Sequence, residues 1–279
     1  MSAASESPEI GETIVADGIA TNVHIQRASA DSDAVLLLHG SGPGVSAFAN
    51  WRLTLPLLAE NFTVVAPDIV GFGFTERPDG ITYDLETWTR HALGVLDAAG
   101  IQRAHVIGNS FGGALALSVA AKHPERVERL VLMGAAGVRF PITEGLDAVW
   151  GYEPSVANMS TIMEYFAYDN SLLGEDLAQL RYEASIRPGV QEAFASMFPE
   201  PRQEALDALC LPEEDVRGID KRTLLVHGRD DQVIPSQTSL RLLELIDDSE
   251  LHIFGRCGHW TQIERSEEFA ALVLQFLMR

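Results

Sequence analysis

The strongest chemical signal in the sequence is a serine between two glycines. Gly108-Asn109-Ser110-Phe111-Gly112 matches the pattern Gly-x-Ser-x-Gly, and it lies between an apolar run typical of a buried strand and a small-residue stretch typical of a helix. Glycines permit the tight turn that joins such a strand to such a helix, and this turn exposes the serine oxygen. We therefore expect Ser110 to be a nucleophile at a helix N-terminus, where negative charge is stabilised.

A serine nucleophile needs a base, and the base needs an orienting carboxylate. His259 is the best candidate base because it lies in a loop between an apolar, strand-like run and the final helical stretch. Asp231 and Asp230 both follow the end of another strand-like run; Asp231 is the preferred acid and Asp230 the alternative. Cys257, two residues before His259, is a weaker alternative nucleophile because Ser110 is better placed.

A second glycine-rich turn, His-Gly-Ser-Gly-Pro-Gly at residues 39–44, directly follows an apolar run. Such a turn can aim a backbone N–H group at a carbonyl oxygen that develops negative charge. We expect the N–H groups of Ser41 and Phe111 to form this donor pair, and the loss of one donor typically costs about 2.7–4 kcal/mol of transition-state stabilisation. A plain glycine-rich turn is the alternative, and the serine motif argues against it.

The elements that must position these residues alternate along the chain. Short, nearly continuous apolar runs are typical of parallel strands buried on both faces. They occupy residues 35–38, 62–66, 105–107, 130–133, 223–226 and 251–254. Stretches with helical spacing, over residues 85–99, 114–122 and 266–276, lie between or after them, with Ser266 as an N-cap candidate. This alternation predicts a mostly parallel, doubly wound α/β sheet. With the serine motif, it predicts the α/β-hydrolase fold, in which nucleophile, acid and base follow this chain order.

The segment from about 135 to 211 has a different character. It contains no strand-like run, carries methionines and aromatic residues on helical stretches, and is interrupted by prolines and glycines. We expect a hydrolase core formed by residues 1–136 and 210–279, and a helical lid over residues 137–209. An independent helical domain is the less favoured alternative, because the strand pattern resumes directly after the segment.

Charge and composition exclude several classes of partner. With 40 acidic and 20 basic residues, the chain has a formal net charge of −20, so we expect neither nucleic acid nor an anionic membrane as a partner. The first residues are polar and acidic, and no apolar run is long enough to cross a bilayer, which predicts a soluble, cytoplasmic protein. Metal and nucleotide motifs are absent from the sequence, so we expect no metal and no cofactor.

The sequence resembles the meta-cleavage product hydrolases, which are carbon–carbon bond hydrolases of aromatic catabolism. The resemblance rests on the combination of residues 39–44, 50–52, 67–73 and 108–113 and extends almost end to end; its specific stretches are residues 140–152 and 257–264. It implies cleavage of a 2-hydroxy-6-oxohexa-2,4-dienoate to 2-hydroxypenta-2,4-dienoate and a small carboxylic acid. A semialdehyde or short alkyl ketone is the expected substrate, and a phenyl ketone is the alternative. The family also implies a homodimer.

Carried over by position, the resemblance implies Ser110, Asp231 and His259 as the triad, with Ser41 and Phe111 as oxyanion donors. Whether Ser110 attacks or activates water stays open. Residues expected to bind substrate are Gly40, Gly42, Asn50, Asn109, Trp260 and, at its carboxylate, Arg181 or alternatively Arg187. Candidates for the apolar end, chosen by their place in the lid and near the acid loop, are Leu146, Trp150, Phe166 and Val233. The competing functions are a carboxylesterase with the same triad and a ligand-binding receptor with little turnover.

Overall fold

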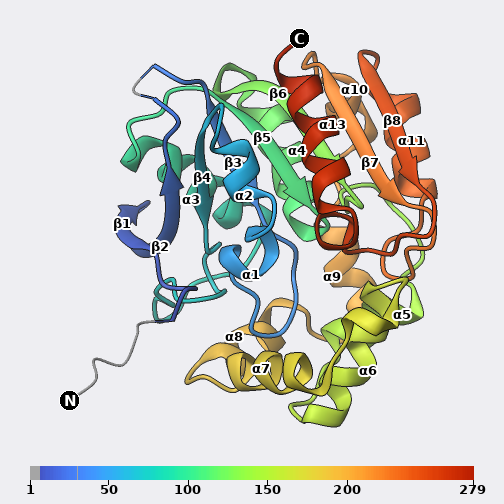
Figure 1. Cartoon of the computed structure of the whole chain (residues 1–279). Helices are drawn as coiled ribbons and strands as arrows, with labels where there is room; N and C mark the ends of the chain where they lie inside the picture. The colour runs from blue at the N-terminus through green and yellow to red at the C-terminus, as the bar shows by residue number, and fades with distance from the viewer. Residues whose placement is uncertain (1–6, 30) are drawn as a thin grey trace.

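A single sheet of eight strands organises the computed structural model, which describes residues 7–29 and 31–279 (Figure 1). The strands are β1 (Glu12–Ala16), β2 (Ile19–Gln26), β3 (Ala34–Leu38), β4 (Thr63–Pro67), β5 (Ala104–Asn109), β6 (Val127–Met133), β7 (Thr223–Gly228) and β8 (Ser249–Phe254). Their order is β1-β2-β4-β3-β5-β6-β7-β8, and the last six in this order run parallel. The predicted mostly parallel α/β sheet is confirmed.

The antiparallel hairpin of β1 and β2 was not predicted. β1 is largely exposed, so it lacks the continuous apolar pattern of the buried strands. The turn between the two strands is Asp17-Gly18, with φ of 49° and 78°. Asp-Gly is a frequent pair in two-residue hairpin turns, so this dipeptide was the available signal.

Helices cover both faces of the sheet and pack on two separate apolar clusters. On one face lie α1 (Ala47–Trp51), α2 (Leu55–Leu58) and α13 (Ser266–Leu277), and on the other lie α3 (Leu85–Ala98), α4 (Phe111–Lys122), α10 (Glu213–Arg217) and α11 (Gln237–Leu245). The short η1 (Pro124–Arg126) precedes β6, and α12 (Thr261–Glu264) precedes α13. The N-cap of α13 is Arg265 rather than Ser266, which is the first helical residue.

Between β6 and β7 the chain forms only helices. They are α5 (Glu144–Trp150), α6 (Val156–Phe166), η2 (Asn170–Leu172), α7 (Glu175–Ser185), α8 (Val190–Met197) and α9 (Arg202–Ala208), followed by α10, which packs beside α11. The hydroxyls of Thr143 and Ser155 accept hydrogen bonds from the first turns of α5 and α6, which sets where these helices begin. Figure 1 shows α6, α7 and α8 grouped beneath the sheet, away from the helices on its faces. No helix of residues 7–29 and 31–279 is long and apolar enough to cross a membrane.

Candidate active site

Ser110 occupies a sharp turn between β5 and α4, with φ 56° and ψ −116°. A positive φ is unfavourable for a residue with a side chain, and costs on the order of 1–3 kcal/mol. Three backbone hydrogen bonds hold it: the Ser110 N–H donates to Met133 O (2.9 Å), and Ser110 O accepts from the N–H groups of Gly113 (2.9 Å) and Ala136 (3.0 Å). A Cβ at Gly112 would collide with the Leu38 carbonyl, so only glycine permits this close approach of α4 to β3.

His259 and Asp231 form a buried pair beside this turn. The His259 Nδ1–H lies 2.7 Å from Asp231 Oδ2, so Nε2 is the ring nitrogen that can act as a base. Gly134 lies one residue beyond Met133, and a Cβ there would be 3.2 Å from Asp231 Oδ2 and 3.3 Å from His259 Nδ1. The end of β6 therefore contacts both the serine turn and the His–Asp pair.

Asp231, not Asp230, is the carboxylate that contacts the histidine. Asp231 Oδ1 accepts hydrogen bonds from the N–H groups of Val233 (2.8 Å) and Ile234 (2.9 Å). Asp230 lies instead beside Arg229 and the N–H of Cys257. Burial would raise the pKa of Asp231, but the charge and hydrogen bonds of the neighbouring histidines outweigh it and hold the pKa below its usual value. Asp231 is therefore a carboxylate that can orient His259.

Hydrogen bonds of the His39 and Trp150 side chains hold the turn at residues 39–44. The His39 Nδ1–H donates to Gly40 O (2.8 Å), and Nε2 accepts from the Ile69 N–H (3.0 Å). Burial lowers the pKa of His39 to about 4, so this ring is neutral. Gly40 O and the Ser41 N–H belong to one trans peptide and point in opposite directions. Because His39 holds this carbonyl, it also fixes the direction of the Ser41 N–H. The Ser41 side chain is held separately, since Trp150 Nε1–H donates to Ser41 Oγ (2.9 Å).

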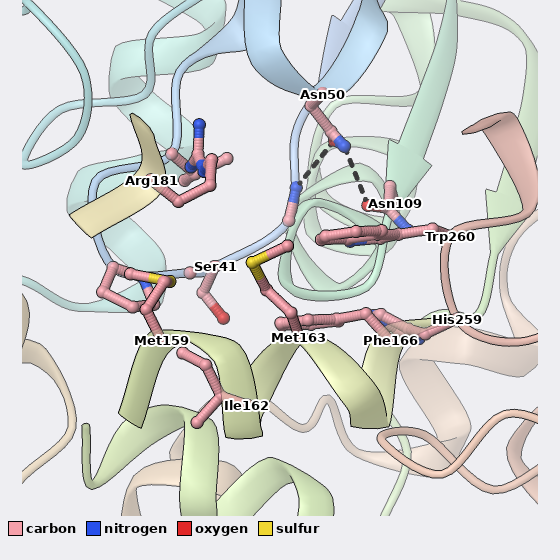
Figure 2. A pocket seen from close by; sticks show the side chains of 14 residues that line it. Ser41, Asn50, Asn109, Met159, Ile162, Met163, Phe166, Arg181, His259 and Trp260 are labelled. Carbon is pink, nitrogen blue, oxygen red and sulfur yellow. Dashed lines mark hydrogen bonds between the residues drawn. The ribbon is translucent and has the colours of Figure 1, made fainter. Parts of the chain in front are cut away.

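A cavity is bordered by the glycine-rich turn and by His259 (Figure 2), whereas Ser110, Phe111 and Asp231 are not among the residues that line it. Residues 40–42, Asn50, Asn109, Phe166, Arg181, His259 and Trp260, all expected from the sequence, line it. The Asn50 amide donates to Asn109 Oδ1 (3.2 Å) and accepts from the Gly40 N–H (3.3 Å), which fixes both amides on one wall. Phe166 and Trp260 stack in parallel, with ring centroids 4.9 Å apart. In Figure 2, Arg181 and His259 lie at opposite ends of the cavity, with Ser41 between them.

The structure separates the two arginines that were candidates for binding a carboxylate. Arg187 is already engaged: its guanidinium lies 3.9 Å from the centroid of the Phe74 ring and 3.9 Å from Glu9 Oε2, and Nε donates to Ala184 O. Arg181 lines the cavity, and among the described residues no hydrogen bond or ion pair engages its guanidinium. Burial lowers the pKa of Arg181, and the negative charge of Glu9 offsets this only in part, so a bound anion would stabilise the buried guanidinium.

Comparisons with known proteins agree with this geometry. The family model of the alpha/beta hydrolase fold matches residues 33–266. A 2-hydroxy-6-oxo-2,4-heptadienoate hydrolase from Pseudomonas putida is 59% identical over 96% of each chain. A 2-hydroxymuconate semialdehyde hydrolase from Pseudomonas sp. strain CF600 is 55% identical over 99% of this chain and 97% of that one. A solved meta-cleavage product hydrolase from Pseudomonas fluorescens IP01, a mutant complexed with acetates, is 55% identical, with a TM-score of 0.95 over 97% of this chain and 98% of the other. The chain belongs to the meta-cleavage product hydrolases.

In this meta-cleavage product hydrolase, three residues expected at the apolar end lie outside the lining of the cavity. Leu146, Trp150 and Val233 are buried in the apolar core. Trp150 and Val233 still contact the site, through Ser41 Oγ and Asp231 Oδ1 respectively. Direct contact of these three with substrate stays a prediction.

Five lining residues were not expected: Pro43, Val45, Met159, Ile162 and Met163. The last three lie on α6 and form one wall in Figure 2. Their helical spacing was visible in the sequence. That spacing cannot distinguish a helix face that packs on the core from one that borders a cavity.

Cys257 does not have the properties of a nucleophile. It is buried, and its Sγ contacts Gly258 O and Thr261 Oγ1 at 3.7 Å each. Burial raises the pKa of this thiol to about 12, and only the thiolate is strongly nucleophilic. We predict that Cys257→Ala retains turnover within about threefold, because its cost is a small loss of packing. Steady-state kinetics checks this, and a loss comparable to that of Ser110→Ala would show that the thiol takes part in catalysis.

Proposed function

We propose that this hydrolase cleaves the C5–C6 bond of 2-hydroxy-6-oxohexa-2,4-dienoates that carry a hydrogen or a short alkyl group at C6. The observation that carries the proposal is the cavity with Arg181, whose guanidinium has no partner among residues 7–29 and 31–279, at one end and His259, hydrogen-bonded to Asp231, at the other. The names of the two relatives support it, since a heptadienoate carries a methyl group at C6 and a semialdehyde carries a hydrogen. A homodimer and a cytoplasmic location remain predictions from the sequence.

The chemistry requires a stabilised leaving group at C5. The dienol loses its O2 proton and gains one at C5, which gives a 2,6-dioxohex-3-enoate. Addition of an oxygen nucleophile to the C6 carbonyl then allows the C5–C6 bond to break. Its electron pair passes into the conjugated C2 carbonyl, and a proton on the resulting oxygen gives 2-hydroxypenta-2,4-dienoate, while C6 leaves as the carboxylic acid.

In this scheme, Ser110 either attacks C6 itself or activates the water that attacks it, and His259 Nε2 accepts the proton. If Ser110 attacks, C6 is left as an acyl ester on Ser110 Oγ, and a water molecule then hydrolyses this ester and releases the carboxylic acid. Asp231 holds the ring and stabilises the imidazolium that forms. Acid–base help of this kind contributes roughly 10²–10⁴ in rate. The N–H groups of Ser41 and Phe111 receive the oxyanion, and His39 keeps the Ser41 peptide in the required orientation.

At the other end of the cavity, Arg181 binds the C1 carboxylate and the charge that develops on O2. A guanidinium can donate two parallel hydrogen bonds to a carboxylate, and such charge-assisted bonds are strong in a site shielded from water. The Asn50 and Asn109 amides, already fixed to each other, border the same polar wall. The positive charge of Arg181 also offsets locally the net charge of −20, which repels an anionic substrate.

The wall formed by Met159, Ile162, Met163 and Phe166 receives the C6 substituent in this proposal. We expect the kcat/KM for compounds with hydrogen or methyl at C6 to be at least about tenfold higher than that for the compound with phenyl at C6. The reason is that one or two misfit groups in an apolar pocket change transition-state binding by about 1–3 kcal/mol. The decrease of the yellow dienolate absorbance measures all three rates. Preference for the phenyl compound would overturn the assignment of substrate size and leave the carbon–carbon hydrolase intact.

A further inference from the structure

The mechanism above leaves one buried imidazole unused. His227 lies on β7, four residues before Asp231, and its side chain is fully buried. Its Nε2 lies 2.9 Å from Ile234 O and 3.4 Å from Asp231 Oδ2. Its Nδ1 lies 2.7 Å from Ser239 Oγ on α11. Both ring nitrogens therefore have partners, and one of those partners is the carboxylate of the candidate triad.

The partners decide where the proton of this ring resides. A carbonyl oxygen can only accept a hydrogen bond, so the bond to Ile234 O requires a proton on Nε2. In the neutral ring Nδ1 is then an acceptor, and Ser239 donates its hydroxyl proton to it. The Nε2–H is thus directed toward Ile234 O, and Asp231 Oδ2 lies 3.4 Å from the same nitrogen as a longer, electrostatic contact.

Asp231 Oδ2 consequently lies between two imidazoles, that of His259 at 2.7 Å and that of His227 at 3.4 Å. The other oxygen, Oδ1, is occupied by the N–H groups of Val233 and Ile234. A donor on Oδ2 stabilises the carboxylate and reduces the negative potential that it exerts on His259. A weaker potential stabilises the protonated form of His259 less.

We propose that His227 is a positioning residue that sets the basicity of His259 through Asp231. The proposal rests on the assignment of Asp231 and His259 to the triad. The titratable groups that face this contact are Asp231 itself, His259 and the thiol of Cys257, which stays protonated because burial raises its pKa. The element packed on the far side, α11, contributes the uncharged hydroxyl of Ser239.

Two substitutions separate this role from packing. A glutamine side chain reaches as far as Nε2 of the native ring, so the His227→Gln variant can still donate to Asp231 and Ile234 O. The asparagine of His227→Asn is shorter and reaches the Ser239 side only. Both side chains are polar amides, so the two variants differ mainly in whether Asp231 keeps its second donor.

The test is the pH profile of kcat/KM for the wild type and the two variants, recorded with a nitrophenyl ester and with the yellow C6-methyl dienoate. In His227→Asn the acid limb of the profile, where activity falls as the pH is lowered, is expected to move to higher pH by about half to one unit. One unit corresponds to about 1.4 kcal/mol, and the shift should not exceed this because the lost N–H contact to Asp231 is a long one. In His227→Gln the limb is expected to stay close to that of the wild type. Ser239→Ala is the matched control: it removes the partner of Nδ1, keeps the Nε2–H, and should lower the melting temperature while leaving the limb in place.

An unmoved acid limb in a folded His227→Asn protein, or equal shifts in the Asn and Gln variants, would overturn the proposal and leave His227 a packing residue. If His227→Asn does not fold, a shifted limb in either His227→Gln or Ser239→Ala still contradicts the proposed role. The ester separates this proposal from the proposed function. A limb that moves with the ester, in a protein that does not cleave the dienoate, would support the role of His227 and reject the substrate.

Discussion

Ser110→Ala is expected to lower kcat for the C6-methyl dienoate by about 10⁴–10⁶-fold, the range seen when the nucleophile of a triad is removed. The dissociation constant of the substrate should change by less than about threefold, because the hydroxyl contributes to the transition state far more than to binding. The turn itself should survive, since the three backbone hydrogen bonds of Ser110 do not involve its side chain. The absorbance decrease measures kcat, and spectral titration with the inactive variant measures binding.

Ser118→Ala is the matched control for this experiment. Ser118 lies on the same helix, α4, is fully buried, and accepts a hydrogen bond from Thr89 Oγ1 (2.9 Å). Its substitution should reduce stability by about 1 kcal/mol and leave kcat within about twofold. A Ser110→Ala protein that keeps more than a tenth of wild-type activity would contradict the assignment of the nucleophile.

Arg181→Ala is expected to lower kcat/KM for the dienoate by about 10²-fold, which corresponds to about 3 kcal/mol for a lost charge-assisted pair in a shielded site. Hydrolysis of a neutral nitrophenyl ester should change by less than about threefold, because that substrate has no carboxylate for Arg181 to bind. Steady-state kinetics with both substrates measures the difference.

Arg187→Ala is the control of matched charge. Arg187 stacks on Phe74 and lies near Glu9, so its loss should affect stability and leave dienoate turnover within about threefold. If Arg181→Ala damages ester and dienoate hydrolysis equally, Arg181 does not bind the substrate carboxylate. If Arg187→Ala causes the larger loss of dienoate turnover, Arg187 and not Arg181 binds the substrate carboxylate.

The parts of the fold that were predictable are those with a strong local pattern. β3, β5 and β7 are buried along their whole length, and each contains a short apolar run that the sequence analysis could locate. β1 lies at the edge of the sheet and exposes most of its residues, so its composition is that of a surface segment. Long-range pairing, and not local pattern, makes this segment a strand.

In the candidate site, too, the features with a strong local pattern were predictable and those that depend on long-range contacts were not. Ser110 and the glycines around it are recognisable because the turn demands these residue types within five positions. Asp230 and Asp231 are adjacent carboxylates, and only the path of the loop decides which one contacts His259. The bond from Trp150 to Ser41 joins residues 109 positions apart, and no local pattern reports it. The contact of His227 with Asp231 likewise depends on how the loop after β7 folds back.

The most direct test of the proposed function is the rate at which the purified protein bleaches the yellow C6-methyl dienoate, beside its rate with a nitrophenyl ester. We expect rapid bleaching, with 2-hydroxypenta-2,4-dienoate and acetate formed in equal amounts, and a kcat/KM at least about tenfold above that for the ester, since Arg181 contributes only to the anionic substrate. Brisk ester cleavage without bleaching would contradict carbon–carbon bond hydrolysis and identify the chain as a carboxylesterase that uses the same His259–Asp231 pair.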